Sequence, residues 1–116
     1  MAEDWARPVV HWSIFAKDPE KQKAFYASLF HWQIGDGFIM DIGPGLGGPE
    51  PGPAGHIQPG EPGFSLFVQV RSIAETLART VELGGEVKGE PFDVPNGPTL
   101  CPIADPEGNP LMLVQQ

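Results

Sequence analysis

The three histidines of the chain, His11, His31 and His56, have the side chains best suited to chemistry near neutral pH. A neutral imidazole can accept a proton, because its unperturbed pKa is about 6.5, and it is also the commonest nitrogen ligand of metals. Two of the histidines stand in the same doublet, His11-Trp12 and His31-Trp32. Whether the two doublets do the same job depends on the elements that carry them.

His11 lies in the segment PVVHWSIFA, which alternates and is rich in β-branched and aromatic residues, as strands are. Successive side chains of a strand point to opposite faces. Trp12 and Ile14 therefore share one face. The opposite face carries His11, Ser13 and Phe15.

A helix is predicted to follow this strand. Asp18 suits the N-cap and Pro19 the first helical position. Phe25 and Leu29 are four residues apart, which predicts the packing face, and the helix should end near Phe30.

Three short strands should complete the first half. Residues 32–34 and 38–42 are predicted to pair around the Gly35-Asp36-Gly37 turn, and His56–Gln58 to form the third strand. The Gly/Pro-rich segment 43–55 between them is predicted to be a long mobile loop, with Gly43–Ala54 its most mobile part.

The order of elements then repeats. Residues 64–70 form a strand, Ser72 and Glu75 form a capping box, and the helix Ile73–Leu83 presents Leu77 and Val81 on one face. The pattern next predicts a strand at 86–88, a hairpin turn at Asn96-Gly97, and a last strand at 110–116.

The two halves share a spacing of 54 residues. This number of residues separates the predicted caps Asp18 and Ser72 in the sequence, and also Leu29 and Leu83. A repeat of this kind indicates that each half must pair with another to bury its apolar face.

Length and charge exclude several classes of protein. With 116 residues and 41% hydrophobic residues, the chain should form one domain with a real core. Its formal net charge of −8 argues against nucleic-acid and membrane partners. We find no signal peptide and no spanning segment, and the single cysteine, Cys101, fits a reducing compartment, so a cytoplasmic location is expected.

The segments HWSIFAKDPEKQKAFYASLFHW and LGGEVKGEPFDVPNGPTLCPIADPEGNPLMLVQ, in this order, resemble the vicinal oxygen chelate superfamily of glyoxalases, bleomycin-resistance proteins and extradiol dioxygenases. The resemblance implies an α+β fold in which two βαβββ repeats form a curved, cup-shaped mixed sheet with helices on its outer face. It implies a single domain over residues 1–116, with halves at about 8–58 and 64–116.

Metal enzymes of this superfamily use four inward positions on the first and last strands of each half. The resemblance places His11, His56, Ser65 and Met112 at these positions. Serine is a poor ligand, and Met112 stands where a glutamate is expected, so a metal site of His11 and His56 would be incomplete. Asp41 or Glu61 could substitute. We expect no cofactor, and a divalent metal is the alternative.

Without a metal, His11 could act as a general base, or it could be a structural histidine bonded to Ser13 or Ser65. The resemblance makes His31 a surface turn residue, and Cys101 should be a small buried hydrophobe. The other residues predicted to line the ligand site are Ser13, Phe15, Gln58, Ser65, Phe67, Gln69 and Met112.

The resemblance and the residues together favour a protein that binds, and could turn over, a small, partly apolar organic molecule in the cup. Two alternatives stay open. One is a metal-dependent lyase, isomerase or dioxygenase that uses His11 and His56. The other is a non-catalytic drug-sequestering protein, for which the acidic chain would favour a cationic ligand. A homodimer is expected, because the fold leaves strand edges open.

Overall fold

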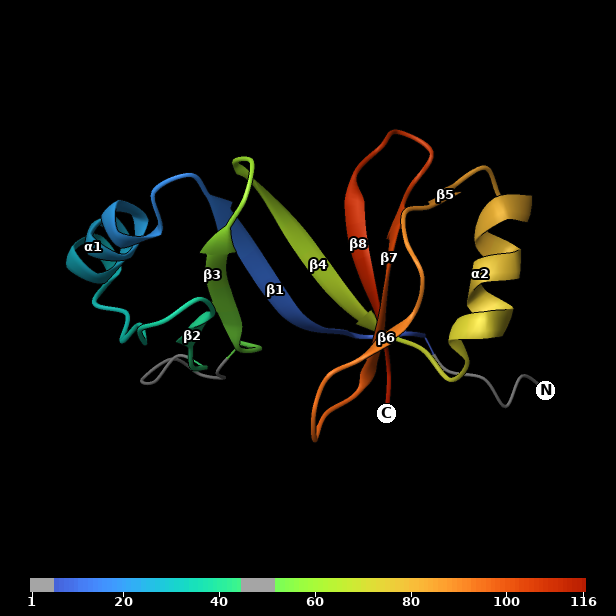
Figure 1. The fold of residues 1–116 in the computed structure, drawn as a ribbon, viewed down its shortest axis with the longest axis horizontal. Coiled ribbons are helices and arrows are strands. Elements are labelled where there is room, and N and C mark those ends of the chain that lie inside the picture. The colour runs from blue at the N-terminus through green and yellow to red at the C-terminus, as the bar shows by residue number, and fades with distance from the viewer. Residues whose placement is uncertain (1–5, 45–51) are drawn as a thin grey trace. The chain divides into compact units, whose positions relative to one another are not determined.

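The computed structural model describes residues 6–44 and 52–116, which fold as two compact units (Figure 1). The first unit is His11–Ser65, and the second joins the residues up to Val10 to Leu66–Gln116. Most of the predicted mobile loop, residues 45–51, lies outside the description. The predicted single domain with halves at 8–58 and 64–116 stays a prediction.

The first unit is built around strand β3 (Gly55–Pro59). It pairs in parallel with β1 (Val9–Ala16) and antiparallel with β2 (Met40–Ile42). Helix α1 (Pro19–Phe30) follows β1 and lies in the connection that parallel strands require. The sheet of this unit is therefore mixed.

The ends of α1 follow local rules. The Asp18 carboxylate accepts a hydrogen bond from the Lys21 backbone N–H at 3.2 Å, and Pro19 takes the first helical position. At the other end, His31 adopts a left-handed conformation with φ 60°, and its N–H donates to the Ala27 carbonyl at 3.0 Å. The predicted start and end of this helix are confirmed.

The predicted packing face of α1 is wrong. Phe25 and Leu29 are 54% and 55% exposed, and none of the helix residues is fully buried. Tyr26 contacts the core instead, and its ring stacks on Trp32 with centroids 5.3 Å apart and an interplanar angle of 9°. The helix is thus turned so that Tyr26, rather than the Phe25–Leu29 pair, meets the core.

The predicted pair of strands at 32–34 and 38–42 is only partly present. Met40–Ile42 forms β2, whereas Ile34 contributes an isolated bridge to Ile42. Asp36 of the intervening turn forms an ion pair with Lys23 on α1, so this turn is tied to the helix. The pairing between these two segments is limited to the single bridge.

In the core of the first unit, the backbone of Gly55 lies close to the Trp12 ring. Gly55 is the register partner of Trp12, and a Cβ on Gly55 would lie 2.3 Å from the indole ring. The Trp12 Nε1–H donates to the Pro53 carbonyl at 2.9 Å. The fully buried members of this core are Ile14, Ala16, Met40, Ile42 and Ile57.

The second unit repeats the plan with more strands. Strand β8 (Pro110–Gln115) pairs in parallel with β4 (Gly63–Gln69) and antiparallel with β7 (Thr99–Ala104). The other edge of β7 pairs with β5 (Glu86–Val87) and β6 (Phe92–Asp93). The extra strand β6 forms the predicted hairpin with β7, in which Asn96 has φ 59°.

Helix α2 (Ile73–Glu82) is amphipathic, unlike α1. Ser72 Oγ accepts the Glu75 N–H at 3.1 Å, which confirms the predicted cap. Ile73 is buried and Leu77 packs against the core, but Val81 is 63% exposed, so the predicted face is right only toward the start of the helix. The buried residues of this core are Val70, Ile73, Cys101, Ile103 and Leu113.

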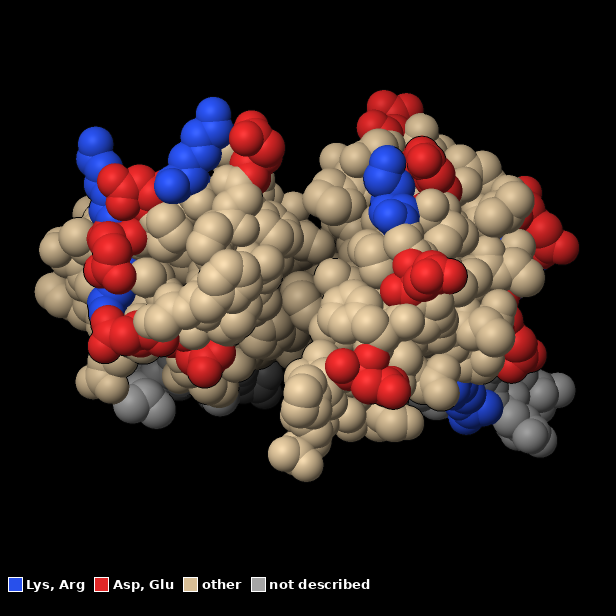
Figure 2. All heavy atoms as spheres, viewed as in Figure 1, with Lys and Arg blue, Asp and Glu red and all other residues tan. Residues whose placement is uncertain are grey.

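The predicted fold class is confirmed, because each unit combines a helix with a mixed sheet, and the order of strand, helix and further strands occurs twice along the chain. None of the helices in residues 6–44 and 52–116 is long and apolar enough to cross a bilayer. Figure 2 shows carboxylates spread over the visible face among fewer basic side chains, in keeping with the net charge of −8.

Candidate functional site

The face of the first unit's sheet that is turned away from its core carries polar side chains. On β1, Ile14 belongs to the core, so His11, Ser13 and Phe15 point the other way. The parallel register places Ser13 beside His56, and Phe15 beside Gln58. The structure therefore brings together the five residues that the sequence assigned to this part of the site.

Asp41 joins the same face from β2, where it is the register partner of His56. The sequence prediction named it only as a possible substitute ligand, without a position. Its place follows from the alternation of Met40, Asp41 and Ile42, in which the two flanking residues are buried and Asp41 is exposed.

A chain of hydrogen bonds connects three of these side chains. His11 Nε2 lies 2.8 Å from His56 Nδ1, and His56 Nε2 lies 2.6 Å from Gln58 Oε1. Because an amide oxygen only accepts, His56 Nε2 carries the proton and its Nδ1 is the acceptor. His11 Nε2–H then donates to His56, and the basic lone pair of a neutral His11 resides on Nδ1.

Two side chains of this polar face are buried, whereas Asp41 is exposed. Ser13 is 0% exposed and His56 is 6% exposed. Ser13 Oγ has no hydrogen-bond partner among the described residues. An unpaired buried hydroxyl costs free energy, and each such case needs an explanation such as a functional role.

The electrostatic surroundings favour the neutral form of His11. Burial lowers the pKa of His11, the neighbouring His56 lowers this pKa further, and the charge of Asp41 acts in the opposite direction. A neutral imidazole at physiological pH is the form that accepts a proton.

The donors at this site do not by themselves make a metal centre. The facing nitrogens of His11 and His56 are hydrogen-bonded to each other rather than directed at a common point. In the described part of the chain, no three or more His, Cys, Asp or Glu side chains gather closely enough to hold a metal ion. A catalytic metal usually takes about three protein ligands.

The second unit carries the remaining predicted lining residues. The parallel register of β4 and β8 places Phe67 beside Met112. This pair stands where Ser13 and His56 stand in the first half, 54 and 56 residues earlier. By alternation along β4, Ser65 and Gln69 share the face of Phe67.

Two other predicted residues are placed as expected. Cys101 is 0% exposed in the core of the second unit, and burial raises the pKa of its thiol. His31 is exposed at the end of α1 and lines a cavity of about 440 Å³ together with Trp32 and Ile42. Neither His11 nor His56 lines this cavity. The two His-Trp doublets thus occupy different settings.

Several solved structures share this fold. A glyoxalase/bleomycin resistance protein/dioxygenase superfamily member from Vibrio splendidus aligns with TM-score 0.67 at 12% identity, over 96% of this chain and 100% of that one. The methylmalonyl-CoA epimerase of Mycobacterium tuberculosis aligns with TM-score 0.61 at 14% identity, over 92% and 86%.

A Mn(II)-bound glyoxalase from Novosphingobium aromaticivorans aligns with TM-score 0.66 at 15% identity, over 97% of this chain but 41% of that one. At these identities the likeness concerns the fold. None of the curated proteins matches the chain.

A family model agrees with the fold. The model described as a glyoxalase-like domain matches residues 10–114, which is nearly the whole chain. This range includes both parallel strand pairs and the predicted site residues of both halves. The chain therefore belongs to the glyoxalase-like domain family of the vicinal oxygen chelate superfamily.

Proposed function

We propose that this protein binds a small, partly apolar organic molecule against the polar face of the first unit, and that His11 is the general base that takes a proton from it. The observation that carries the proposal is the hydrogen-bonded chain of His11, His56 and Gln58. A chain of this kind orients the first imidazole and fixes its tautomer, as the supporting groups of catalytic histidines do.

The proton can be followed atom by atom. A substrate proton accepted at His11 Nδ1 converts the ring to an imidazolium, whose Nε2–H already donates to His56 Nδ1 at 2.8 Å. Transfer of the Nε2 proton to His56 moves the positive charge to that ring, whose other N–H donates to Gln58 Oε1. Asp41 favours the charged state of His11. The reverse transfers return the proton to product.

The nature of the ligand follows from the lining. Ser13 supplies a buried hydroxyl, and Phe15 supplies an apolar surface beside Gln58. A few polar groups among apolar ones are typical of small-molecule sites. The contributions of Ser65, Phe67, Gln69 and Met112 to the same site stay predictions.

The structural neighbours favour proton transfer next to a carbonyl group. One of them is a methylmalonyl-CoA epimerase. Epimerisation at a carbon next to a carbonyl needs a base that removes and returns a proton, which is the chemistry we assign to His11. An isomerase or epimerase acting on a small acyl compound is therefore the enzyme activity that we propose.

Solvent exchange tests this proposal directly. The protein is mixed in D₂O with methylmalonyl-CoA and a panel of smaller carbonyl compounds, and NMR follows both the α-protons and the imidazole protons of His11 and His56. At least one compound should shift the imidazole signals and exchange its α-proton. His11→Gln should slow this exchange about 10²- to 10⁴-fold.

His31→Asn is the matched control, because asparagine tolerates the left-handed conformation of His31. It should leave exchange unchanged. The proposal fails if no compound in the panel shifts the imidazole signals, or if both variants lose exchange equally.

The two other functions give different results in the same experiment. Imidazole shifts without exchange would favour a drug-sequestering protein, and the net charge of −8 makes cationic compounds the first to try there. Exchange that depends on added Mn²⁺ would favour the metal-dependent alternative with His11 and His56 as ligands.

A homodimer is part of the proposal. Helix α1 exposes Phe25, Leu29 and Phe30, each at least half accessible in the single chain. Apolar groups that gather at a surface are often covered by a partner. Light scattering should show twice the mass of the chain, and a monomer at high micromolar concentration would contradict this. The cytoplasmic location stays a prediction.

A further inference from the structure

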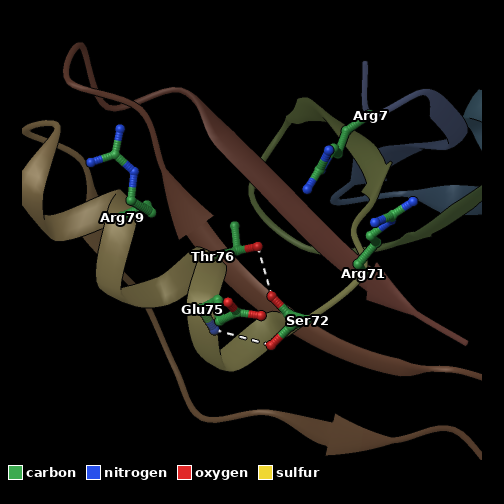
Figure 3. Close-up of a pocket in the computed structure, with 6 residues that line it drawn as sticks. All are labelled: Arg7, Arg71, Ser72, Glu75, Thr76 and Arg79. Atoms are coloured by element: carbon green, nitrogen blue, oxygen red, sulfur yellow. Dashed lines mark hydrogen bonds between the residues drawn. The ribbon is translucent and has the colours of Figure 1, made fainter. Parts of the chain in front are cut away.

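All three arginines of the chain line one cavity. The cavity has a volume of about 450 Å³, lies in the second unit, and is lined by Arg7, Arg71, Ser72, Glu75, Thr76 and Arg79 (Figure 3). None of the four lysines lines it. In an acidic chain, this concentration of one residue type sets the cavity apart.

Three separate segments bring the arginines there. Arg71 lies in the connection from β4 to α2, and Arg79 lies on α2 two turns beyond the cap Ser72. Arg7 precedes β1, where the Pro8 carbonyl accepts the Gln69 N–H at 3.0 Å and so holds this segment beside the end of β4. Figure 3 shows Arg7 and Arg71 to one side of the first turn of α2, with Arg79 further along the helix.

Of the two hydroxyl groups among the described lining residues, one can still donate a hydrogen bond to a ligand. Ser72 Oγ accepts the Glu75 N–H at 3.1 Å, and its own O–H can donate to a ligand. Thr76 Oγ1 already donates to the Ser72 carbonyl at 2.7 Å. Arg79 bonds Glu82 at 2.6 Å, but both side chains are more than 60% exposed, so water and ions screen this pair and a ligand can compete with it.

The charges of the lining favour an anion. The described lining residues include three guanidinium groups and the carboxylate of Glu75, whereas the chain as a whole carries a net charge of −8. Guanidinium groups bind phosphate and carboxylate oxygens through paired hydrogen bonds, and three of them suit a doubly charged oxyanion better than a single carboxylate. The volume exceeds what one phosphate ion needs and falls in the range of small-molecule sites.

We propose that this cavity binds the phosphate group of a small phosphorylated compound through Arg7, Arg71 and Arg79, with Ser72 Oγ as a further donor. The site lies in the second unit and does not depend on the function proposed for His11. It offers the chain a second ligand, distinct from the molecule bound at the histidines.

Titration with two probes tests the proposal. Inorganic phosphate and ribose 5-phosphate are added at constant ionic strength, and backbone amide shifts of residues 71–79 are followed by NMR. Both probes should saturate these shifts below about 10 mM. Arg71→Gln and Arg79→Gln should each weaken binding about tenfold or more, because each removes a charge-assisted hydrogen bond.

Two further variants sharpen the test. Lys88→Gln removes the same charge from the same unit outside the cavity, where Lys88 contacts Glu86, and it should change binding less than about twofold. Glu75→Gln removes the carboxylate of Glu75 from the described lining and should tighten binding. Thermal unfolding of each variant checks that the fold is intact.

The outcomes separate specific binding from general attraction. Tighter binding of ribose 5-phosphate than of phosphate supports a site for a phosphorylated compound, and equal binding supports a site for the phosphate group alone. The proposal is overturned if neither probe saturates, if Lys88→Gln weakens binding as much as Arg71→Gln does, or if succinate binds as tightly as phosphate.

Discussion

The two halves of this protein share a backbone plan but carry different chemistry on equivalent strands. In each half the first and last strands pair in parallel, β1 with β3 and β4 with β8. Ser13 and His56 occupy the register position that Phe67 and Met112 occupy in the second half. The first half therefore presents a buried polar pair where the second presents an apolar one.

The two helices also differ, but here the second half is the one with the more apolar contact to its core. Helix α2 buries Ile73 and packs Leu77 against its core, whereas α1 contains no fully buried residue and exposes Phe25 and Leu29. The first half relies instead on aromatic contacts, in which Trp32 packs against Tyr26 and Trp12.

The comparison shows which features a repeated fold conserves. Strand pairing uses main-chain groups, so it tolerates exchange of the side chains that point away from the core. Each helix packs against its own core through different side chains. A repeated backbone can thus carry a hydrogen-bonded pair of histidines in one half only.

The largest expected effect is a difference in stability between variants of the two helices. Ile73→Ala should destabilise the protein by about 2–5 kcal/mol, because it leaves a cavity in a packed core. Leu29→Ala on α1 should cost less than about 1 kcal/mol, since Leu29 is 55% exposed. Urea denaturation of both variants measures the difference, and equal losses would mean that α1 is packed as tightly as α2.

The close approach in the first core predicts the next effect. Gly55→Ala should cost about 1–3 kcal/mol, because the new Cβ would lie 2.3 Å from the Trp12 ring and force it to move. Gly63→Ala is the control, since its nearest neighbour would be 4.0 Å away. Trp fluorescence should change with Gly55→Ala only. A neutral Gly55→Ala would show that Trp12 does not need this approach.

Replacing His56 by methionine puts into the first half the residue type that Met112 provides at the equivalent position of the second half. His56→Met should cost about 1–3 kcal/mol, because it leaves His11 Nε2 and Gln58 Oε1 without their shared partner. It should also raise the pKa of His11, which His56 lowers. NMR titration of the His11 ring measures this shift. An unchanged pKa would mean that the pair is not coupled.

The pH dependence of stability should follow His11. Its pKa is lowered in the folded protein, so below the unfolded-state value of about 6.5 the unfolded chain binds more protons and stability falls with decreasing pH. The contribution is fully present above about pH 6.5 and is lost as the pH falls through the folded-state pKa. His11→Gln should flatten the unfolding free energy in this window, and an unaltered slope would assign it to other groups.

The smallest effect should come from metal. Added Mn²⁺ should leave the melting temperature unchanged, because the donors of the first half do not converge on one point. A bound ion at 100 times its dissociation constant would instead stabilise the fold by about 2.7 kcal/mol. A rise in melting temperature that His11→Gln and His56→Met both abolish would restore the metal alternative.

Local chemistry in the sequence determined much of this protein. The caps Asp18 and Ser72 start their helices as predicted, and Asn96 turns the hairpin with φ 59°. Alternation along residues 9–16 places His11 and Ser13 opposite the core. These features depend on residues that are close in sequence, so the pattern alone carries them. The pairing of His56 with this strand followed from the family resemblance.

The remaining features depend on the tertiary structure. It turned α1 so that Tyr26 rather than Phe25 meets the core, and it reduced the predicted strand at 32–34 to one bridge. It placed Asp41 beside His56, joined the two imidazoles by a hydrogen bond, and brought Arg7 to the cavity of Arg71 and Arg79. Each of these outcomes depends on contacts between residues distant in sequence, where packing and electrostatics select one arrangement among several that local pattern allows equally.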